Sequence, residues 1–486
     1  MSALNICFLI NYILCFFAIF GMIFIEHKKP VRIIAWSLAL IIIPFGGLLL
    51  YVLIGYGLGR RTRRLLKKRM LYNNRYHESL QNQIEELSSH SQTKIDPDFK
   101  DYVMLNLKNA NSVLTKSNDV KYFSYGPDML ESLKQDLLNA KKTINIMFYI
   151  FANDSTGKEI KDILVQKAKE GVRVKVLYDA IGSLKTHKFQ FRKLKKAGGE
   201  VQEFFPAFMG LKLFNIRANY RNHRKIVVID GKVGYMGGMN IRNDHMGKKK
   251  KVSPWRDCHI RICGPAIYSL QNIFISDWRL SSKKPEPQNY FLNEDYFCEN
   301  IGSGDTAMQI VASAPTESED RNIEEMMIKM IYTAQTSIKI QTPYFVPDEQ
   351  FLMAIKMALL SGVKVEIIVP KKPDKQFVYS ATLAYLKEVE NMGAKIYLYH
   401  GFLHTKAVMV DDKILTMGSC NIDIRSFALN FEVNAVVYGE KDCEKFVQIF
   451  EIDKQNSTPV DTTYFKKLLL IRKMTMSFMK LFSAVL

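Results

Sequence analysis

The sequence is poor in cysteine and in acidic side chains, and both shortages narrow the range of functions. Its seven cysteines are an odd number, and no two of them form a CxxC pair. This spacing argues against a disulfide framework or a zinc site, so we expect reduced, mostly buried thiols. Asp and Glu number 48 against 68 Lys and Arg, which gives a formal net charge of +20. The charge indicates a polyanionic partner, either nucleic acid or an anionic membrane surface.

Two long stretches near the N-terminus contain no charged side chain. Residues 4–25 and 33–56 are apolar, and each is long enough to cross the roughly 30 Å hydrocarbon core of a bilayer as a helix. The first stretch lacks the basic n-region and the small-residue cleavage site of a signal peptide. We therefore expect residues 1–59 to form a transmembrane helical hairpin in a multi-pass protein of the cell membrane.

A basic segment follows the second apolar stretch and predicts the orientation. Seven Lys and Arg residues lie between Arg60 and Arg69, against three in the loop between the two stretches. Because positive residues accumulate on the cytoplasmic side, the rest of the chain is expected to be cytoplasmic. The same side chains would lie against anionic lipid headgroups. We expect residues 60–110 to form this basic juxtamembrane segment and a linker, in part an exposed helix.

Beyond the linker, the chain repeats one pattern of strands and helices. A strand expected at residues 171–178 has its counterpart at residues 362–369, and helical patterns ending in glycine accompany both. Strands alternating with helices predict α/β units around a largely parallel sheet, and the recurrence predicts an internal repeat. The expected fold class is α/β, with two similar domains, residues 111–304 and 305–486, packed as a pseudo-twofold pair.

Each copy of the repeat contains a His-x-Lys-x4-Asp motif. The His and Lys are two residues apart on a predicted strand and so share one face. The Asp is an odd number of residues further on and, in the first copy, precedes a glycine, so we expect it mainly to shape the turn. Lysine is not an ordinary metal ligand, so no metal is expected. The catalytic set of one shared site comprises His223, Lys225, Asp230, His404, Lys406 and Asp411.

Two further residue types recur after each motif and complete the expected site. A small-residue turn ends in Asn, whose amide can donate to an oxyanion. An acid follows later, and a carboxylate that accepts from one ring nitrogen fixes the tautomer of a histidine. A lone His-x-Lys carries little weight, but this ordered duplication favours chemistry over a purely structural role. The supporting and phosphate-binding residues are expected to be Asn240, Asn421, Asp257 and Glu432.

These motifs resemble those of the phospholipase D superfamily, and more narrowly those of the bacterial cardiolipin synthases. The narrower resemblance rests on residues 222–226, 255–257, 342–348, 401–406 and 423–432. It implies two phospholipase D-like domains behind the membrane hairpin. It also implies that two phosphatidylglycerol molecules give cardiolipin and glycerol through a phosphatidyl-histidine intermediate, with no cofactor or metal.

The resemblance further implies that His223 is the nucleophile and His404 the acid and base, although the near symmetry of the repeat decides nothing by itself. A hydrolytic phospholipase D, or another phosphatidyltransferase acting on membrane phospholipids, is the alternative because the chemistry is shared. A nuclease would explain the charge but not the apolar N-terminus, so no nucleic-acid partner is expected. A non-enzymatic membrane scaffold would function without either histidine.

The expected partners are phosphatidylglycerol, cardiolipin and an anionic lipid surface, and the oligomeric state is left open. Residues 465–486 mix Leu, Ile, Met and Phe with Lys and Arg. This basic amphipathic composition suits either an interfacial helix or a helix docked on the catalytic core.

Overall fold

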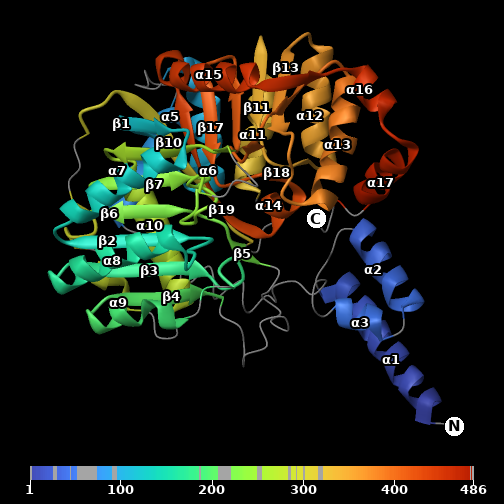
Figure 1. Ribbon diagram of the computed structural model, residues 1–486, viewed down its shortest axis with the longest axis horizontal. Coiled ribbons are helices and arrows are strands. Elements are labelled where there is room, and N and C mark those ends of the chain that lie inside the picture. Colours follow the sequence, from blue (N-terminus) through green and yellow to red (C-terminus); the bar gives the residue numbers. More distant parts are fainter. Residues whose placement is uncertain are drawn as a thin grey trace.

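The chain forms a small group of N-terminal helices and a larger α/β body (Figure 1). In the body one long sheet runs through both halves, and three hydrophobic clusters form where helices pack against it. The α/β class predicted from the sequence is thereby confirmed. The computed structural model describes residues 3–25, 30–43, 45–51, 74–89, 96–184, 186, 188–205, 220–248, 254–282, 286–291, 293–298, 302–315, 321–481 and 483.

The first half of the body alternates strands and helices up to its fourth strand and then turns to hairpins. In chain order it comprises β1 (Thr115–Phe123), α7 (Gly126–Asn139), β2 (Thr143–Phe148), α8 (Ser155–Lys169), β3 (Arg173–Asp179), η4 (Lys188–Phe191), α9 (Arg192–Lys196), β4 (Glu200–Phe204), β5 (Arg221–Asn222), β6 (Ile226–Ile229), β7 (Val233–Gly237), β8 (Trp255–Arg256), β9 (His259–Cys263), α10 (Ile267–Ser281) and η9 (Gln288–Phe291).

The second half repeats this succession and adds three helices and a strand near its end. It comprises β10 (Thr306–Ser313), α11 (Asn322–Thr333), β11 (Ser337–Gln341), β12 (Phe345–Val346), α12 (Glu349–Leu360), β13 (Lys364–Pro370), α13 (Gln376–Asn391), β14 (Lys395–Tyr399), β15 (Phe402–Leu403), β16 (Ala407–Val410), β17 (Ile414–Gly418), β18 (Ile422–Asp423), α14 (Ile424–Ala428), β19 (Asn430–Tyr438), α15 (Glu440–Gln455), β20 (Ser457–Val460), α16 (Thr462–Lys467) and α17 (Leu470–Leu481).

The order of strands in the sheet is nearly the same when read from either end. The middle of the sheet is the antiparallel pair β1–β10, in which Thr115 faces Met308. Outward from β1 come β9, β7, β6, β2, β3 and β4, and outward from β10 come β19, β17, β16, β11, β13 and β14, with β20 at the edge. Each of these strands except β20 therefore has its counterpart at the same place in the other half, which is the pseudo-twofold arrangement predicted from the repeat.

The expectation of a largely parallel sheet is wrong. Parallel pairs join β2 to β3 and β3 to β4, and likewise β11 to β13 and β13 to β14. The pairs between β2 and the middle of the sheet are antiparallel. The physical reason is the tight hairpin between β6 and β7. Asp230 and Gly231 both have positive φ there and reverse the chain.

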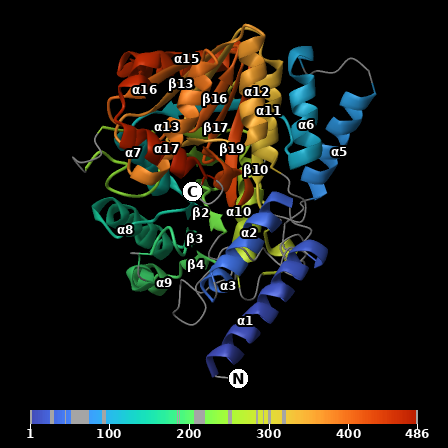
Figure 2. The ribbon, with the colours of Figure 1, turned by 90° about the vertical axis from the view of Figure 1, so that its right-hand side faces the viewer.

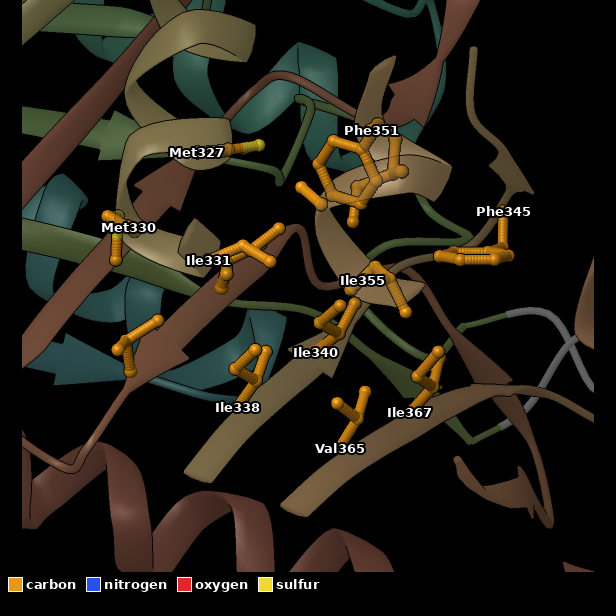
Figure 3. Packing of buried hydrophobic residues seen from close by; sticks show 14 of the residues in the cluster. Met327, Met330, Ile331, Ile338, Ile340, Phe345, Phe351, Ile355, Val365 and Ile367 are labelled. Atoms are coloured by element: carbon orange, nitrogen blue, oxygen red, sulfur yellow. The ribbon is translucent and has the colours of Figure 1, made fainter. Parts of the chain in front are cut away.

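The core of the second half shows why these apolar residues form these elements (Figure 3). Met327, Met330 and Ile331 of α11 lie three or four residues apart on one helix face and are buried. In Figure 3 they point toward Ile338 and Ile340, which alternate along β11 and share one face of the sheet. Each such buried side chain contributes about 1.5–3 kcal/mol to folding.

The segment expected as a linker contains two helices that pack on the second half. They are α5 (Asn74–Ser88) and α6 (Lys100–Ala110), the latter preceded by the short η3 (Pro97–Phe99). Leu80 and Leu87 of α5 are buried in the core of the second half. The basic residues between Arg60 and Arg69 lie outside the described residues.

The N-terminal helices differ from the expected pair of spanning helices. α1 (Ala3–Phe20) continues through a π-helical turn, η1 (Gly21–Ile25), and residues 4–24 are long and apolar enough to cross a membrane. The second stretch instead contains two shorter helices, α2 (Pro30–Ile42) and α3 (Gly46–Leu50). Figure 2 shows α1, α2 and α3 as one group beside the body.

α3 folds back on α2, so the second expected span is not one continuous helix. The ring of Tyr51 lies 5.4 Å from that of Trp36, whereas a straight helix would separate the two residues by about 22 Å. A Cβ atom on Gly47 would lie 2.3 Å from Ala39 O, so only glycine permits this approach. The prediction of one spanning helix over residues 33–56 is therefore wrong as far as Tyr51, because this part forms two short helices that fold back on each other. Residues 52–56 lie outside the described residues.

Candidate active site

Each motif histidine lies beside the other half of the molecule, in a three-residue link between two strands: His223 between β5 and β6, and His404 between β15 and β16. β5, just before His223, pairs in parallel with the start of β19, and His223 N donates to Phe431 O at 2.9 Å. β15, just before His404, pairs in parallel with β8, and His404 N donates to Arg256 O at 2.6 Å. The two short cross-half ladders are equivalent under the pseudo-twofold, and they bring both motifs to one place.

The two histidines are oriented by acids of the opposite halves. His223 Nδ1 lies 3.0 Å from both carboxylate oxygens of Glu432, which belongs to the second half. His404 Nδ1 lies 2.6 Å from Asp257 Oδ2, which belongs to the first half. A carboxylate can only accept, so each Nδ1 carries the proton and each Nε2 is left free to act as a base or nucleophile. Neither half therefore contains a complete histidine–acid pair of its own.

The two acids are held differently, which breaks the symmetry of the site. Glu432 also accepts from Ser419 Oγ at 2.5 Å and from Asn430 Nδ2 at 3.0 Å. Burial alone would raise the pKa of the Glu432 carboxyl, but His223, its neighbouring lysine and Ser419 hold it below its usual range. Asp257 accepts from Cys258 N at 2.8 Å. Glycine at position 238 makes room for it, because a Cβ atom there would lie 2.1 Å from Asp257 Oδ1.

The two motif lysines are buried cations beside the histidines. Lys225 Nζ donates to His223 O at 2.5 Å, and Lys406 Nζ donates to His404 O and lies 2.9 Å from His404 Nδ1. Burial, together with the charge of the other lysine, lowers the pKa of Lys225 to about 7, against the attraction of Glu432. Burial lowers the pKa of Lys406 to about 8. An anion beside the two lysines would stabilise their charged forms, so the site favours an anionic ligand.

Both histidines are held in the neutral form. Burial lowers the pKa of His223, although the Glu432 carboxylate opposes the effect. Burial and then the charges of Lys406 and Lys225 hold the pKa of His404 well below its usual range. A neutral imidazole with Nδ1 bound to a carboxylate is the form that can attack phosphorus. An entering phosphate would bring the negative charge needed to protonate the second ring.

The two motif aspartates lie at the far ends of their strands, in the turns that the odd spacing indicates. Asp230 accepts from the backbone N–H groups of Lys141, Lys142 and Thr143 at 2.7–2.8 Å. Asp411 binds the corresponding start of β11, accepting from the N–H groups of residues 335, 336 and 337. Both have φ of 53°. They fasten each β-hairpin to the strand beside it.

The two motif asparagines are buried at equivalent positions but have different partners. Asn240 Oδ1 accepts from Ile150 N at 3.0 Å, and its backbone N–H donates to His245 Nδ1 at 3.2 Å. Asn421 Nδ2 donates to Ser426 Oγ at 3.3 Å, while its Oδ1 has no partner within the described part of the chain. A serine thus stands in the second half where the first half has a histidine.

His245 was not predicted from the sequence. It is buried, its ring lies 4.0 Å from that of Trp255 and 5.4 Å from that of His404, and its Nδ1 is 4.0 Å from Asp257 Oδ2. Burial and the neighbouring His404 hold its pKa well below the usual range, so it is neutral. Its place five residues after Asn240 was the available signal, but the second copy has Ser426 and not a histidine at that place.

Three residues of the site, His245, Asp257 and His404, bring together atoms that could bind a metal ion. The ligand atoms of His245, Asp257 and His404 lie within 4.8 Å of one another. Lys406 Nζ sits 2.9 Å from His404 Nδ1, and its positive charge opposes a cation at this point. The contact between Asp257 and His404 is therefore better explained as the hydrogen bond that orients the imidazole than as half of a metal site.

A buried ion pair between Arg224 and Asp277 holds the segment around His223, and the sequence did not predict it. Arg224 Nη1 donates to both oxygens of Asp277 at 2.8 Å, and Arg224 Nε donates to Glu432 O at 3.0 Å. Asn222 Nδ2 donates to Asp277 Oδ2 at 2.8 Å. Arg224 thus holds the backbone of Glu432, the acid that orients His223. The position of Arg224 between His223 and Lys225 was the one feature of the sequence that could have indicated this role.

Comparisons with known proteins identify the family of this chain. A family model described as "Cardiolipin synthase, PLD-like domain" matches residues 133–278 and 327–454. The major cardiolipin synthase ClsA of Bacillus subtilis is 40% identical over 454 residues, which cover 93% of this chain and 92% of that protein. The cardiolipin synthase of Listeria innocua is 41% identical over 432 residues, or 88% of each chain.

A solved structure supports the fold alone. The phosphatidylserine synthase of Haemophilus influenzae superposes with a TM-score of 0.60 at 17% identity, covering 79% of this chain and all of that one. With the family model and the relatives above matching most of the chain, this chain belongs to the cardiolipin synthase family of phospholipase D-like proteins.

Proposed function

We propose that the protein is a cardiolipin synthase that transfers a phosphatidyl group between two phosphatidylglycerol molecules. The observation that carries the proposal is the crossed pairing of His223 with Glu432 and of His404 with Asp257. This pairing supplies two neutral, tautomer-fixed imidazoles beside two buried lysines. Phosphodiester exchange needs these groups: a nucleophile, a proton carrier and positive charge for the phosphate.

In the first half-reaction His223 Nε2 attacks phosphorus of one phosphatidylglycerol. The new P–N bond forms as the bond from phosphorus to the headgroup glycerol breaks. His404, protonated when the anionic phosphate enters, gives its proton to the departing glycerol oxygen. The products are phosphatidyl-His223, free glycerol and neutral His404. The assignment of His223 as nucleophile follows the family resemblance.

In the second half-reaction the headgroup hydroxyl of another phosphatidylglycerol attacks the same phosphorus. Neutral His404 removes the hydroxyl proton, the P–N bond breaks, and cardiolipin leaves. His404 ends protonated as it began, so the cycle balances without a metal or cofactor. Lys225 and Lys406, with the amides of Asn240 and Asn421, stabilise the charge on the nonbridging oxygens.

The membrane placement follows from the substrates and from α1, whose residues 4–24 are apolar and long enough to span. The seven basic residues between Arg60 and Arg69 support a body on the cytoplasmic side. Phosphatidylglycerol, cardiolipin and the anionic surface that they form are the proposed partners.

Labelled phosphatidylglycerol supplied to membranes that contain the protein tests the proposal. Cardiolipin and glycerol should form in equal amounts, and His223→Ala and His404→Ala should each abolish both. Phosphatidate and glycerol without cardiolipin would identify a hydrolytic phospholipase D instead. Turnover that survives in both variants would show that the crossed site is not the catalyst.

A further inference from the structure

The last helix of the chain leaves an apolar stripe uncovered. α17 packs against α13, and its Met476 and Met479 are buried. Along another side of the same helix, large apolar side chains recur every three or four residues. A contiguous apolar patch on the solvent-exposed surface of a protein marks an interaction site. The α17 stripe consists of five side chains that are 58–78% exposed: Leu470, Ile471, Met474, Phe478 and Leu481.

The charges around the α17 stripe point to its partner. Lys466, Lys467 and Arg472 flank it, and residues 465–486 contain no acidic side chain. Apolar side chains beside cations fit the headgroup region of an anionic bilayer, where the apolar groups insert and the cations meet phosphates. A second copy of the chain is a poor partner, because each copy carries a formal net charge of +20 and the same basic rim.

The stripe begins at the end of α13 that lies nearest the active site. Burial raises the pKa of Tyr379, in the first turn of α13, and the charge of nearby Arg472 opposes that rise. Further along, Lys480 pairs with Glu388 at 2.5 Å, so the two helices run in the same direction. Phe377, in the first turn of α13, is 68% exposed.

The loop just before α13 reaches the catalytic groups. Gln341 of β11 pairs with Ile368 of β13 on one side and with Ala407 of β16 on the other, so the end of β13 from which this loop leaves lies beside the start of β16, three residues after His404. The exposed phenyl ring of Phe377 and the start of the α17 stripe therefore lie on the same side of the body as this loop. Figures 1 and 2 both place α17 on the side from which α1 and α2 project.

We propose that the α17 stripe and Phe377 lie in the headgroup region of the membrane and hold the active-site loop against the bilayer. A lipid headgroup then reaches the buried lysines while its acyl chains stay in the membrane. The proposal rests on the proposed function for its lipid substrate, but its test measures position rather than activity.

Full-length protein in proteoliposomes tests this, with Phe478→Trp as the probe. Leu360→Trp is the matched control, because Leu360 is 72% exposed and lies before β13, at the opposite end of that strand from Phe377. Phosphatidylglycerol vesicles with and without brominated acyl chains measure lipid contact, and iodide measures contact with water. Quenching of the parent protein, which has three tryptophans, is subtracted.

The expected result is quenching of Trp at position 478 by brominated lipid and none at position 360. Equal quenching by iodide at both positions would show a stripe in water and overturn the proposal. Protection from iodide without quenching by lipid would indicate a protein partner, such as a second copy, and would also overturn it. Loss of cardiolipin synthesis in either variant affects none of these readings.

A second inference comes from the fold-back of α2 and α3, which changes the membrane topology. Phe45, between the two helices, lies beside α1: its ring is 5.2 Å from that of Phe8, and its N–H donates to Asn11 Oδ1 at 3.2 Å. Non-helical backbone at membrane depth needs such a partner. The chain then returns, and Tyr51 packs against Trp36. α3 therefore runs back along α2, towards the end at which α2 begins.

The distribution of charge agrees with this return. No Lys or Arg precedes α1, three lie in the loop before and at the start of α2, and seven lie between Arg60 and Arg69. A two-span hairpin would put the two basic groups on opposite sides of the membrane. A single crossing followed by a re-entrant pair puts both on one side, as the positive-inside rule favours. We infer that α1 alone crosses the membrane and that the N-terminus lies opposite the catalytic body.

Single cysteines in the full-length chain test the topology with a membrane-impermeant maleimide. The reporters are Ser2→Cys, Lys29→Cys and Ser89→Cys, in a background whose accessible native cysteines are replaced by serine. Lys29→Cys and Ser89→Cys should react from the same side, and Ser2→Cys from the other. Reaction of Lys29→Cys and Ser89→Cys from opposite sides would establish two spans, and reaction of all three from one side would exclude a crossing.

Discussion

Replacing Lys225 by Met is expected to stabilise the fold while abolishing transfer. The side chain is fully buried and its pKa falls from 10.5 to about 7. That shift corresponds to about 5 kcal/mol of unfavourable charge burial. The folded-state pKa is the lower one, so the unfolded chain binds more protons between these values and wild-type stability rises with pH across this window. Below about pH 7 the full penalty is present, and Met removes it without changing the volume much.

The gain should therefore depend on pH. Integration over the same two pKa values makes the gain at pH 6 larger than that at pH 9 by about 3 kcal/mol. Thermal unfolding of the full-length protein in detergent micelles, followed by fluorescence at the two pH values, measures it. The matched control is Lys175→Met: Lys175 is also buried, but it pairs with Glu200 and Glu286 at 2.5 and 3.2 Å, so its loss should destabilise. A lower melting temperature for Lys225→Met at pH 6 would refute the reasoning.

Three further predictions concern the site and its supports. Glu432→Gln keeps the shape but loses the charge that orients His223, so kcat should fall by about a hundredfold or more; a normal kcat would mean that the pairing is incidental. Asp230→Ala strips three backbone N–H groups of their acceptor and should cost about 2–4 kcal/mol of stability, seen as a lower melting temperature, while the molecules that remain folded stay active. The lowered pKa values of Lys225 and Lys406, about 7 and about 8, leave both neutral above pH 8 in the free enzyme. The value of kcat/KM for phosphatidylglycerol should then fall by about tenfold per pH unit between pH 7 and 8, where one lysine titrates, and by about a hundredfold per unit above pH 8, where both do. A flat profile up to pH 10 would show that their charge is not needed.

Much of the fold and of the site could be predicted because the same order of strands, helices and motif residues occurs in both halves of the sequence. The odd position of Asp230 indicated a turn, which the structure has, whereas His223 and Lys225 were expected on a strand and lie in the short link between β5 and β6. Both expectations follow from the period of two along a strand. The acids Asp257 and Glu432 were expected to orient histidines, since each follows its motif at a similar distance.

What the sequence did not reveal depends on contacts between the halves. Nothing in one copy indicates that Glu432 faces His223 rather than His404, because the spacing within a copy carries no information on the packing of the two copies. His245 was missed because the second copy has a serine, Ser426, at the equivalent position. The fold-back at Gly47 was missed because apolar composition over residues 33–56 fits a straight span equally well.

The crossed histidine–acid pairs make catalysis dependent on the last fifth of the chain. A polypeptide that ends before Glu432 already contains both histidines and both lysines, but His223 lacks its acid and the edge of the sheet at β10 lacks β19. In such an incomplete chain His223 has no carboxylate to fix its tautomer. We therefore expect the active site to be assembled only after β19 has been made and has paired with β10.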